Sequence, residues 1–381
     1  MRLQNYLNQK PMFYAEIDYK RAPRAFESIK NSLILNSKIV HLVGTNAKGS
    51  TGRFLAYYLH RAGYSVGHYS SPHIVDFNER IWIDGKNISD EKLESAHDRL
   101  QLLLNEEFKK SLSYFEYTTF LALVAFENLD FIIFEAGLGG EYDATSVVES
   151  DLTLVTPIDF DHMDFLGDTI EQIATTKLKA TKQKAIIGEQ SHSEVFNIAK
   201  ELELDFKSYQ EYIDKELKYQ IEDFISKKNL PKFFTQNLSL AVASLIELNL
   251  FDNLSKIEDI QIFGRFYKLS ENITIDVGHN PLSARAIANS LGEKKVNLIY
   301  NTYSDKNYTL ILDILKDNIK KLYLIDFENQ RLEDAESIFR VCRELKIEYE
   351  KLKKIENSKE YLVYGSFSTI EQFLKGFHFE R

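Results

Sequence analysis

The chain has 381 residues, which favours two domains of ordinary size or one unusually large one. Apolar residues make up 44% and charged residues 27%, so a wholly disordered, collagen-like or coiled-coil chain is excluded. Acidic residues outnumber basic ones by 57 to 47, giving a net charge of −10. A protein that coats nucleic acid or an anionic membrane is usually basic, so we expect neither partner.

Three features predict a cytoplasmic location. The single cysteine, Cys342, cannot form an intrachain disulfide, and the chain lacks the cysteine spacing of metal sites. The first 14 residues lack the apolar core of a signal peptide. Further along, no apolar run approaches the ~18–20 residues that a membrane-spanning helix needs.

Short apolar runs alternate with longer amphipathic stretches from Ile39 onward. The first series predicts strands and helices at residues 39–43, 52–62, 65–69, 118–128, 130–135, 152–157 and 184–188. A second series follows Arg265, with predicted elements at residues 272–277, 281–291, 296–300, 322–326, 332–345 and 360–364. Strand–helix alternation is typical of mostly parallel sheets covered by helices, so the sequence predicts an α/β fold.

The residues between the two series suggest where the domains divide. Residues 190–232 are charged and only weakly periodic, and an alanine-rich helical pattern follows at 237–250. The short segment 259–264 leads into the second series and is a candidate hinge. We therefore predict one domain over residues 1–262 and another over residues 263–381.

Residues 41–51, with the sequence HLVGTNAKGST, run from an apolar strand into a helix. Small residues at such a junction let backbone N–H groups surround phosphate oxygens, and the helix adds its positive N-terminal end. The candidate ATP-binding residues are Thr45, Asn46, Ala47, Lys48, Gly49, Ser50 and Thr51. The segment is not a strict GxxxxGK[ST] loop, because position 42 is leucine and Gly49 separates Lys48 from Ser50. A plain strand–turn–helix junction with a surface lysine is the alternative.

Several further motifs follow this loop in a fixed order. They are GYSVGHYSSPH at 63–73, FNER at 77–80, YFEY at 114–117, EAGLGG at 135–140, DAT at 143–145, DH at 161–162, LGDT at 166–169, GR at 264–265 and DVGHNP at 276–281. Together they closely resemble the folylpolyglutamate synthase/dihydrofolate synthase family of Mur-ligase-like amide ligases, over about residues 40–370. The resemblance implies a P-loop-type Mur ligase central domain followed by a smaller Rossmann-like C-terminal domain.

The resemblance also implies the activity. The γ-phosphoryl of ATP is transferred to a carboxylate, and the amino group of L-glutamate attacks the resulting acyl phosphate. Basic residues and Mg²⁺, two ions by family analogy, neutralise the charge that develops on the phosphoryl group. We expect dihydropteroate and reduced folates as acceptors, in folate biosynthesis, and a monomeric protein.

The resemblance assigns the first metal site to Ser71, Glu135 and His162. Each follows or ends a predicted strand, where open α/β sheets place their ligands, and oxygen-rich ligation suits Mg²⁺. Glu135 could instead be the buried partner of a basic side chain, and His162 an ordinary core histidine.

A fourth residue, Lys177, matches the position of a lysine that is carbamylated in many relatives. Carbamylation would turn this cation into an anionic oxygen ligand for a second Mg²⁺. Here Thr176 replaces the neighbouring acid of the family pattern, and Leu178-Lys179 replaces Ala-Gly. A lysine on the helix surface is the alternative.

In the second half, the resemblance assigns nucleotide binding to Asn237, Arg265 and Asp276, with Arg265 clamping phosphates and Asp276 holding the ribose. His279, followed by Asn280, is expected to assist at the phosphate, beside Lys48 and Lys177 as catalytic residues. Asn237 could instead be a helix N-cap. Phe233 and Phe234 replace a His-Gln pair of relatives and could stack on adenine.

The acceptor pocket follows from two matching segments. Its candidate residues are Ser113, Tyr114, Phe115, Glu116, Tyr142, Asp143 and Ala144, and aromatic faces suit a flat pteridine. Simple core packing is the alternative for Tyr114 and Phe115. Ser304, Asp305 and Lys306 match a segment expected near the incoming glutamate.

We therefore predict a bifunctional ligase. The alternatives are a monofunctional folylpolyglutamate synthase, a peptidoglycan-type Mur ligase and a degenerate nucleotide-binding relative without catalysis. The Ser-Pro-His and Tyr-Phe-Glu segments argue against the Mur ligase. Ala47, which stands where relatives carry glycine, is among the departures that favour the degenerate relative. Retention of Lys48, Glu135, His162 and Arg265 counts against it.

Overall fold

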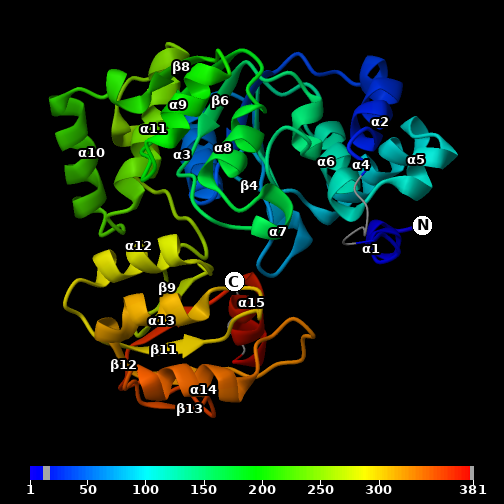
Figure 1. Ribbon diagram of the computed structural model, residues 1–381. Coiled ribbons are helices and arrows are strands. Elements are labelled where there is room, and N and C mark those ends of the chain that lie inside the picture. The colour runs from blue at the N-terminus through cyan, green and yellow to red at the C-terminus, as the bar shows by residue number, and fades with distance from the viewer. Residues whose placement is uncertain (12–17, 378–381) are drawn as a thin grey trace. The chain divides into compact units, whose positions relative to one another are not determined.

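The computed structural model describes residues 1–11 and 18–377 (Figure 1). The chain forms two compact units, the first made of Met1–Phe224 and Gln236–Ile260 and the second of Ile225–Thr235 and Gln261–Arg381. Within the described residues, none of the helices combines the length and the apolar character that a membrane crossing requires.

The first unit is built on an eight-stranded sheet in the order β4-β3-β2-β5-β1-β6-β7-β8. Strands β2, β5, β1, β6, β7 and β8 are parallel, and β3 and β4 add an antiparallel edge. The strands are β1 (Lys38–Val43), β2 (Val66–Tyr69), β3 (Ile81–Ile83), β4 (Lys86–Asn87), β5 (Phe131–Glu135), β6 (Leu152–Val155), β7 (Lys184–Ile187) and β8 (Asp205–Ser208). The central strands are buried along nearly their whole length because helices cover both faces.

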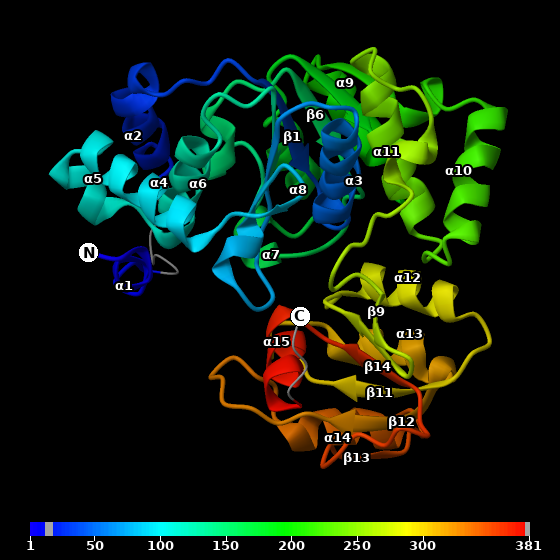
Figure 2. The same ribbon diagram turned by 180° about the vertical axis from the view of Figure 1, so that it is seen from behind.

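Helices lie on both sides of this sheet, with α8 in front in Figure 1 and α3 in front in Figure 2. The helices of this part of the chain are α1 (Leu3–Leu7), α2 (Arg21–Ile29), α3 (Lys48–Arg61), α4 (Asp90–Leu103), α5 (Glu106–Ser111), α6 (Tyr114–Ala125), α7 (Met163–Leu166), α8 (Ile170–Leu178), α9 (Glu194–Glu201), α10 (Lys215–Lys227) and α11 (Phe234–Glu247). Capping boxes start two of them: Ser113 with Glu116 at α6, and Thr169 with Gln172 at α8.

The second unit has a six-stranded sheet in the order β13-β12-β11-β14-β10-β9. Its strands are β9 (Tyr267–Ser270), β10 (Ile273–Asp276), β11 (Val296–Tyr300), β12 (Ile319–Leu324), β13 (Tyr349–Lys351) and β14 (Tyr361–Tyr364), all parallel except β9. Its helices are α12 (Pro281–Leu291), α13 (Tyr308–Leu315), α14 (Ala335–Glu344) and α15 (Phe367–Gly376). Phe233 packs against the core of this unit together with Phe266.

The predicted α/β class is confirmed, and each predicted strand has a counterpart within a few residues of its expected position. The sequence did not predict β4, β8, β9 and β13, which are the edge strands of the two sheets, or β3, which has only three residues. The sequence also did not predict regular secondary structure within residues 190–232, where α9, β8 and α10 form.

Candidate active site

The loop between β1 and α3 is held by the segment that follows β6. The N–H of Thr45 donates to the Pro157 carbonyl at 2.9 Å, and its hydroxyl donates to the Asp159 carbonyl at 2.9 Å. Gly44 has a φ of 144°, and a Cβ there would lie 2.0 Å from the Thr156 hydroxyl oxygen. Only glycine fits at this position, and the loop is thereby fixed at the carboxyl edge of the sheet.

Ala47 lies in the left-handed region, with φ 70° and ψ −5°, directly before α3. This conformation is strained for a residue with a Cβ. We predict that Ala47→Gly raises the free energy of unfolding by about 1 kcal/mol and the Tm by about 2–4 °C.

Thermal and denaturant unfolding would measure this effect, and Ala56→Gly is the matched control. Ala56 lies in the interior of α3, where glycine should destabilise the protein instead. A lower stability of Ala47→Gly would contradict the account of the strain.

Two lysines meet at the carbonyl of Gly44. Lys48 Nζ donates to it at 3.0 Å and to the Thr45 carbonyl at 3.2 Å, and Lys177 Nζ, from α8, donates to it at 2.9 Å. The Lys177 side chain is buried, so the interpretation of a lysine on the helix surface is wrong. Burial, assisted by the positive charge of Lys48, lowers the pKa of Lys177 to about 7. An amine with such a pKa is largely neutral slightly above neutral pH and can act as a nucleophile.

Glu135 ends β5 next to this loop and is buried. Its Oε2 atom accepts the N–H of Ser71 at 3.2 Å, and a Cβ on Gly49 would lie 3.2 Å from the same oxygen. Two of the three predicted metal ligands are therefore adjacent, beside the first turn of α3. Both the metal site and the alternative role of Glu135 as the buried partner of a basic side chain stay predictions.

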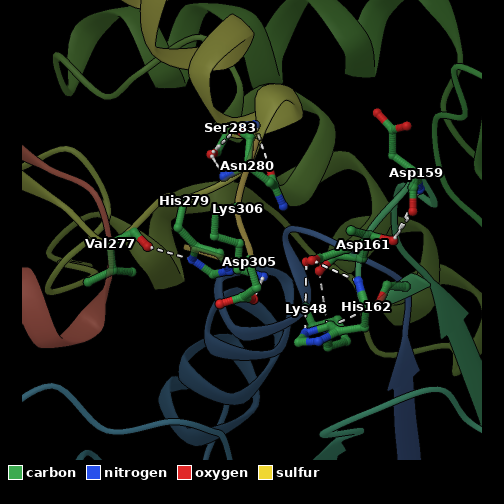
Figure 3. Close-up of polar contacts among 12 residues, drawn as sticks. Lys48, Asp159, Asp161, His162, Val277, His279, Asn280, Ser283, Asp305 and Lys306 are labelled. Carbon is green, nitrogen blue, oxygen red and sulfur yellow. Dashed lines mark hydrogen bonds and ion pairs between the residues drawn. The ribbon is translucent and has the colours of Figure 1, made fainter. Parts of the chain in front are cut away.

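The third predicted ligand, His162, precedes α7 with a φ of 51°. Its side chain is 45% exposed, and its Nε2 atom lies 3.9 Å from Asp161 Oδ2, so it is not a core histidine. Figure 3 shows Asp161 and His162 beside Lys48. In the described part of the chain, no three His, Cys, Asp or Glu side chains are grouped as a metal site. The predicted set contains only two such residues, because its third member is a serine.

Ser50, Thr51 and Asn237 lie beneath the loop. The Asn237 amide donates to the Ser50 hydroxyl at 2.8 Å, and that hydroxyl donates to the Ala47 carbonyl at 3.1 Å. Asn237 is inside α11, which begins at Phe234, so its interpretation as an N-cap is wrong. The buried hydroxyl of Thr51 has no hydrogen-bond partner among the described residues.

The polar residues of the predicted acceptor pocket hold backbone groups. The Glu116 carboxylate accepts the N–H of Ser113 at 2.7 Å and forms an ion pair with Arg21 at 2.9 Å. Asp143, which precedes Ala144, accepts the N–H groups of Gly137, Leu138 and Thr145 at 2.9–3.0 Å. Burial raises the pKa of the Asp143 carboxyl. These carboxylates therefore hold the loops that carry the predicted acceptor residues.

Aromatic rings line the same region. Phe115 lies so close to Gly137 that a Cβ there would be 2.5 Å from the ring. Tyr142 is exposed and contacts Tyr19, with 4.4 Å between the ring centroids and 42° between the ring planes. Tyr114 contacts Phe77 edge-on at 6.4 Å. Tyr114 and Phe115 are half-buried beside the core, so packing explains only part of their surface.

The remaining predicted residues, Arg265, Asp276 and His279, belong to the second unit. Asp276 is buried and accepts the N–H groups of Phe266 at 2.8 Å and Gly278 at 2.7 Å. Burial raises the pKa of its carboxyl, and the charge of Arg265 opposes that rise.

His279 and Asn280 precede α12 (Figure 3). His279 Nδ1 lies 3.1 Å from the Val277 carbonyl, which can only accept, so Nδ1 carries the proton and Nε2 can accept one when the ring is neutral. Asn280 caps α12 through the Ser283 N–H at 2.9 Å. The convergence of these groups with Lys48 on one nucleotide stays a prediction.

Two further expectations concern residues at or near the second unit. The Phe234 ring is fully buried, so it offers no face to adenine, and Phe233 packs against the core of the second unit. Lys306 Nζ lies 3.6 Å from Asp305, whose carboxylate also accepts from Arg331 at 3.1 Å. These contacts hold residues 304–306 in place.

Sequence reasoning overlooked two charged residues of the first unit. Asp161 raises the pKa of Lys177 and thereby opposes the effect of burial, and Arg21 pairs with Glu116. Asp161 belongs to a motif that the sequence did show, whereas nothing local to Arg21 predicts its partner 95 residues away.

Known proteins resemble this chain along nearly its whole length, although no family model matches it. A dihydrofolate synthase/folylpolyglutamate synthase of Buchnera aphidicola is 31% identical over 377 residues, covering 90% of this chain and 88% of that protein. The crystal structure of Helicobacter pylori folylpolyglutamate synthetase is 36% identical, with a TM-score of 0.80 over 98% of this chain and 97% of that one.

A third structure shares the fold at lower identity. It is the bifunctional folylpolyglutamate synthase/dihydrofolate synthase of Yersinia pestis complexed with AMPPNP and Mn ion, at 24% identity and a TM-score of 0.79 over 98% of this chain and 97% of that one. The identity and coverage of the first relative establish the family. This chain belongs to the dihydrofolate synthase/folylpolyglutamate synthase family.

Proposed function

We propose that the protein is an ATP-dependent ligase that adds L-glutamate to dihydropteroate and to reduced folates. The observation that carries the proposal is the cluster at the β1–α3 loop, where Lys48, Lys177 and Glu135 surround the start of a helix. Family membership supplies the reaction class, and this cluster supplies the charges that phosphoryl transfer needs.

The proposed reaction has two steps that balance. An acceptor carboxylate oxygen attacks the γ-phosphorus of ATP, the bond to the β–γ bridging oxygen breaks, and ADP leaves. The neutral amino group of L-glutamate then attacks the acyl carbon of the acyl phosphate. Inorganic phosphate leaves and the nitrogen loses a proton, so an amide, ADP and phosphate are the products.

In the first step, the residues of this chain bind and orient. The loop N–H groups and the N-terminus of α3 face the phosphates, and Lys48 reaches the transferred phosphoryl. In the second unit, Arg265, Asp276 and His279 are proposed to contact the same nucleotide. Tyr114, Phe115 and Tyr142 present aromatic faces to the pteridine.

Mg²⁺ fits the donors present in the first unit. Glu135 contributes a buried carboxylate, Ser71 a hydroxyl, and His162 an exposed imidazole. The ion would neutralise charge on the phosphate oxygens when bound. A carbamate on Lys177 would add an anionic oxygen for a second ion. Its formation consumes the neutral amine and CO₂ and releases one proton, and the pKa of about 7 supports it.

The decisive experiment measures phosphate release from ATP with Mg²⁺ and L-glutamate, and supplies dihydropteroate and tetrahydrofolate separately as acceptors. We expect release with both. Release with tetrahydrofolate alone would favour a monofunctional enzyme, an alternative that the 36% identity to a Helicobacter pylori folylpolyglutamate synthetase supports. Release with neither acceptor would favour the non-catalytic relative and contradict the proposal.

We further propose that the protein acts as a monomer in the cytoplasm. A single buried cysteine suits a reducing compartment. Light scattering coupled to gel filtration should give a mass near 44.3 kDa, and a mass near twice that value would contradict the monomer.

A further inference from the structure

Arg80 is a buried arginine whose charge lacks a carboxylate partner among the described residues. The residue is 7% exposed. Its Nε atom donates to His73 Nδ1 at 2.9 Å, and its guanidinium carbon lies 5.3 Å from the centroid of the Tyr114 ring and 5.9 Å from that of Phe77. The two terminal nitrogen atoms therefore carry donors with no acceptor among the described residues. Neither nitrogen is among the fully buried polar atoms that lack a partner, so both are open to an anion from outside the chain, and the low exposure of the residue would strengthen such a pair.

The neighbouring groups do not neutralise this charge. His73 Nδ1 accepts a hydrogen bond, so that ring is neutral and its proton is on Nε2. Glu79, the nearest acid in sequence, accepts the N–H groups of Ile74, Val75 and Asp76 at 2.8–3.0 Å. The aromatic rings attract the guanidinium without cancelling its charge.

The position of Arg80 joins it to the candidate active site. Its carbonyl accepts the N–H of Ser70 at 3.0 Å, and the next residue, Ser71, donates its N–H to Glu135. Arg80 therefore lies at the same edge of the first unit's sheet as the proposed metal ligands. On its other side is Tyr114, a residue of the proposed acceptor pocket.

We propose that Arg80 binds the carboxylate of the acceptor, the group that becomes phosphorylated. The inference rests on the proposed function and adds a residue to it. Arg80 and Tyr114 together suit a ligand that has both a flat aromatic system and a carboxylate. The aromatic system would pack against Tyr114, and the carboxylate would form two hydrogen bonds with the guanidinium. The first step brings together two anions, the nucleotide phosphates and the acceptor carboxylate. Lys48 is proposed to bind the phosphates, and Arg80 is the cation that can bind the carboxylate.

Direct binding tests this role without turnover. The probes are dihydropteroate and its benzamide analogue, in which a neutral carboxamide replaces the carboxylate. The wild type should bind dihydropteroate on the order of 100-fold more tightly than the amide, because a buried charge pair is lost with the carboxylate. In Arg80→Met this preference should vanish, while the affinity for the amide stays close to that of the wild type.

Further variants keep the test decisive. Arg80→Lys retains the positive charge but loses the planar guanidinium, so it should keep part of the preference for the carboxylate. This variant also tests the proposal if Arg80→Met does not fold. Arg24→Met is the matched control, because Arg24 is an exposed arginine paired with Asp18. The KM for dihydropteroate and that for tetrahydrofolate should rise by the same factor in Arg80→Met, with the affinity for ATP unchanged.

Three outcomes would overturn the inference. Both Arg80 variants could keep the full preference for the carboxylate. The loss could be confined to tetrahydrofolate, which would place Arg80 at the α-carboxylate of its glutamate. A wild type that binds neither probe and turns over neither acceptor would overturn the proposed function as well, whereas an active wild type with unaffected variants would overturn only the role of Arg80.

Discussion

Replacement of Lys177 by alanine should lower ligase turnover on the order of 100- to 1,000-fold, the usual cost of removing a group that stabilises charge in a transition state. The residue is buried beside the phosphate loop and has a pKa of about 7. If its carbamate serves the reaction, acetate or formate added to the variant should restore part of the rate, because a small carboxylate can replace the missing oxygen ligand. Phosphate release measures both effects.

Lys179→Ala is the control for this variant, because Lys179 lies two residues further on, is 42% exposed and pairs with Glu141 at 3.3 Å. It should retain full activity. Full activity of Lys177→Ala without any additive would contradict both the carbamate and a catalytic role for the amine.

The same lysine predicts a dependence on pH. Only the neutral amine attacks CO₂, so at limiting CO₂ the activity should increase as the pH rises through about 7. In the unmodified protein, the Lys177 amine has a pKa of about 7 when the protein is folded and its ordinary pKa of 10.5 when it is unfolded. Between these two pH values, the unfolded protein therefore binds one proton more at this amine than the folded protein does. Stability from this group therefore increases with pH across that window. A rate that is flat from pH 6 to 8 at limiting CO₂ would contradict the prediction.

Replacement of Lys48 by methionine should also remove turnover, on the order of 100- to 1,000-fold, because the transferred phosphoryl loses its nearest cation. A second effect follows from the shared Gly44 carbonyl. Without Lys48, one of the charges that lower the pKa of Lys177 is gone, so that pKa should rise above 7. Phosphate release measures the first effect, and the pH at which ¹⁴CO₂ is trapped on Lys177 measures the second.

Lys38→Met is the matched control for Lys48, since Lys38 is exposed and lies at the start of β1, the strand that leads into the loop before Lys48. It should change neither quantity. Unaltered binding of ATP and unaltered turnover in Lys48→Met would show that this loop does not serve the nucleotide.

The central strands could be predicted because they are continuous apolar runs, as in β5 with its sequence FIIFE. The edge strands could not. Strand β4 consists of Lys86 and Asn87, and β8 has the sequence DFKS, so neither carries an apolar pattern. Both exist because a neighbouring strand offers free backbone groups, which is information that lies elsewhere in the chain.

The functional residues divide in the same way. Motifs placed Lys48, Glu135 and Lys177 in the sequence, but only the fold gives Lys177 its burial and its contact with a carbonyl 133 residues away. The sequence allows Asn237 to be either a nucleotide ligand or a helix N-cap. Because α11 begins at Phe234, Asn237 lies inside the helix and is not its N-cap. The pattern S-x-x-E at Ser113 and Glu116 is a capping box, which local reasoning can recognise. Nothing in the sequence around Arg80 predicts that this residue is buried.

The assignment of Ile225–Thr235 to the second unit has a practical consequence for dissecting the enzyme. A fragment that starts at Gln261 would lack Phe233, and the apolar surface that its ring covers on the core of the second unit would meet water. Such a fragment should aggregate during expression. Fusing residues 225–235 ahead of it through a Gly/Ser spacer should recover a soluble piece, so a useful fragment of the second unit needs this internal segment as well as the C-terminal part of the chain.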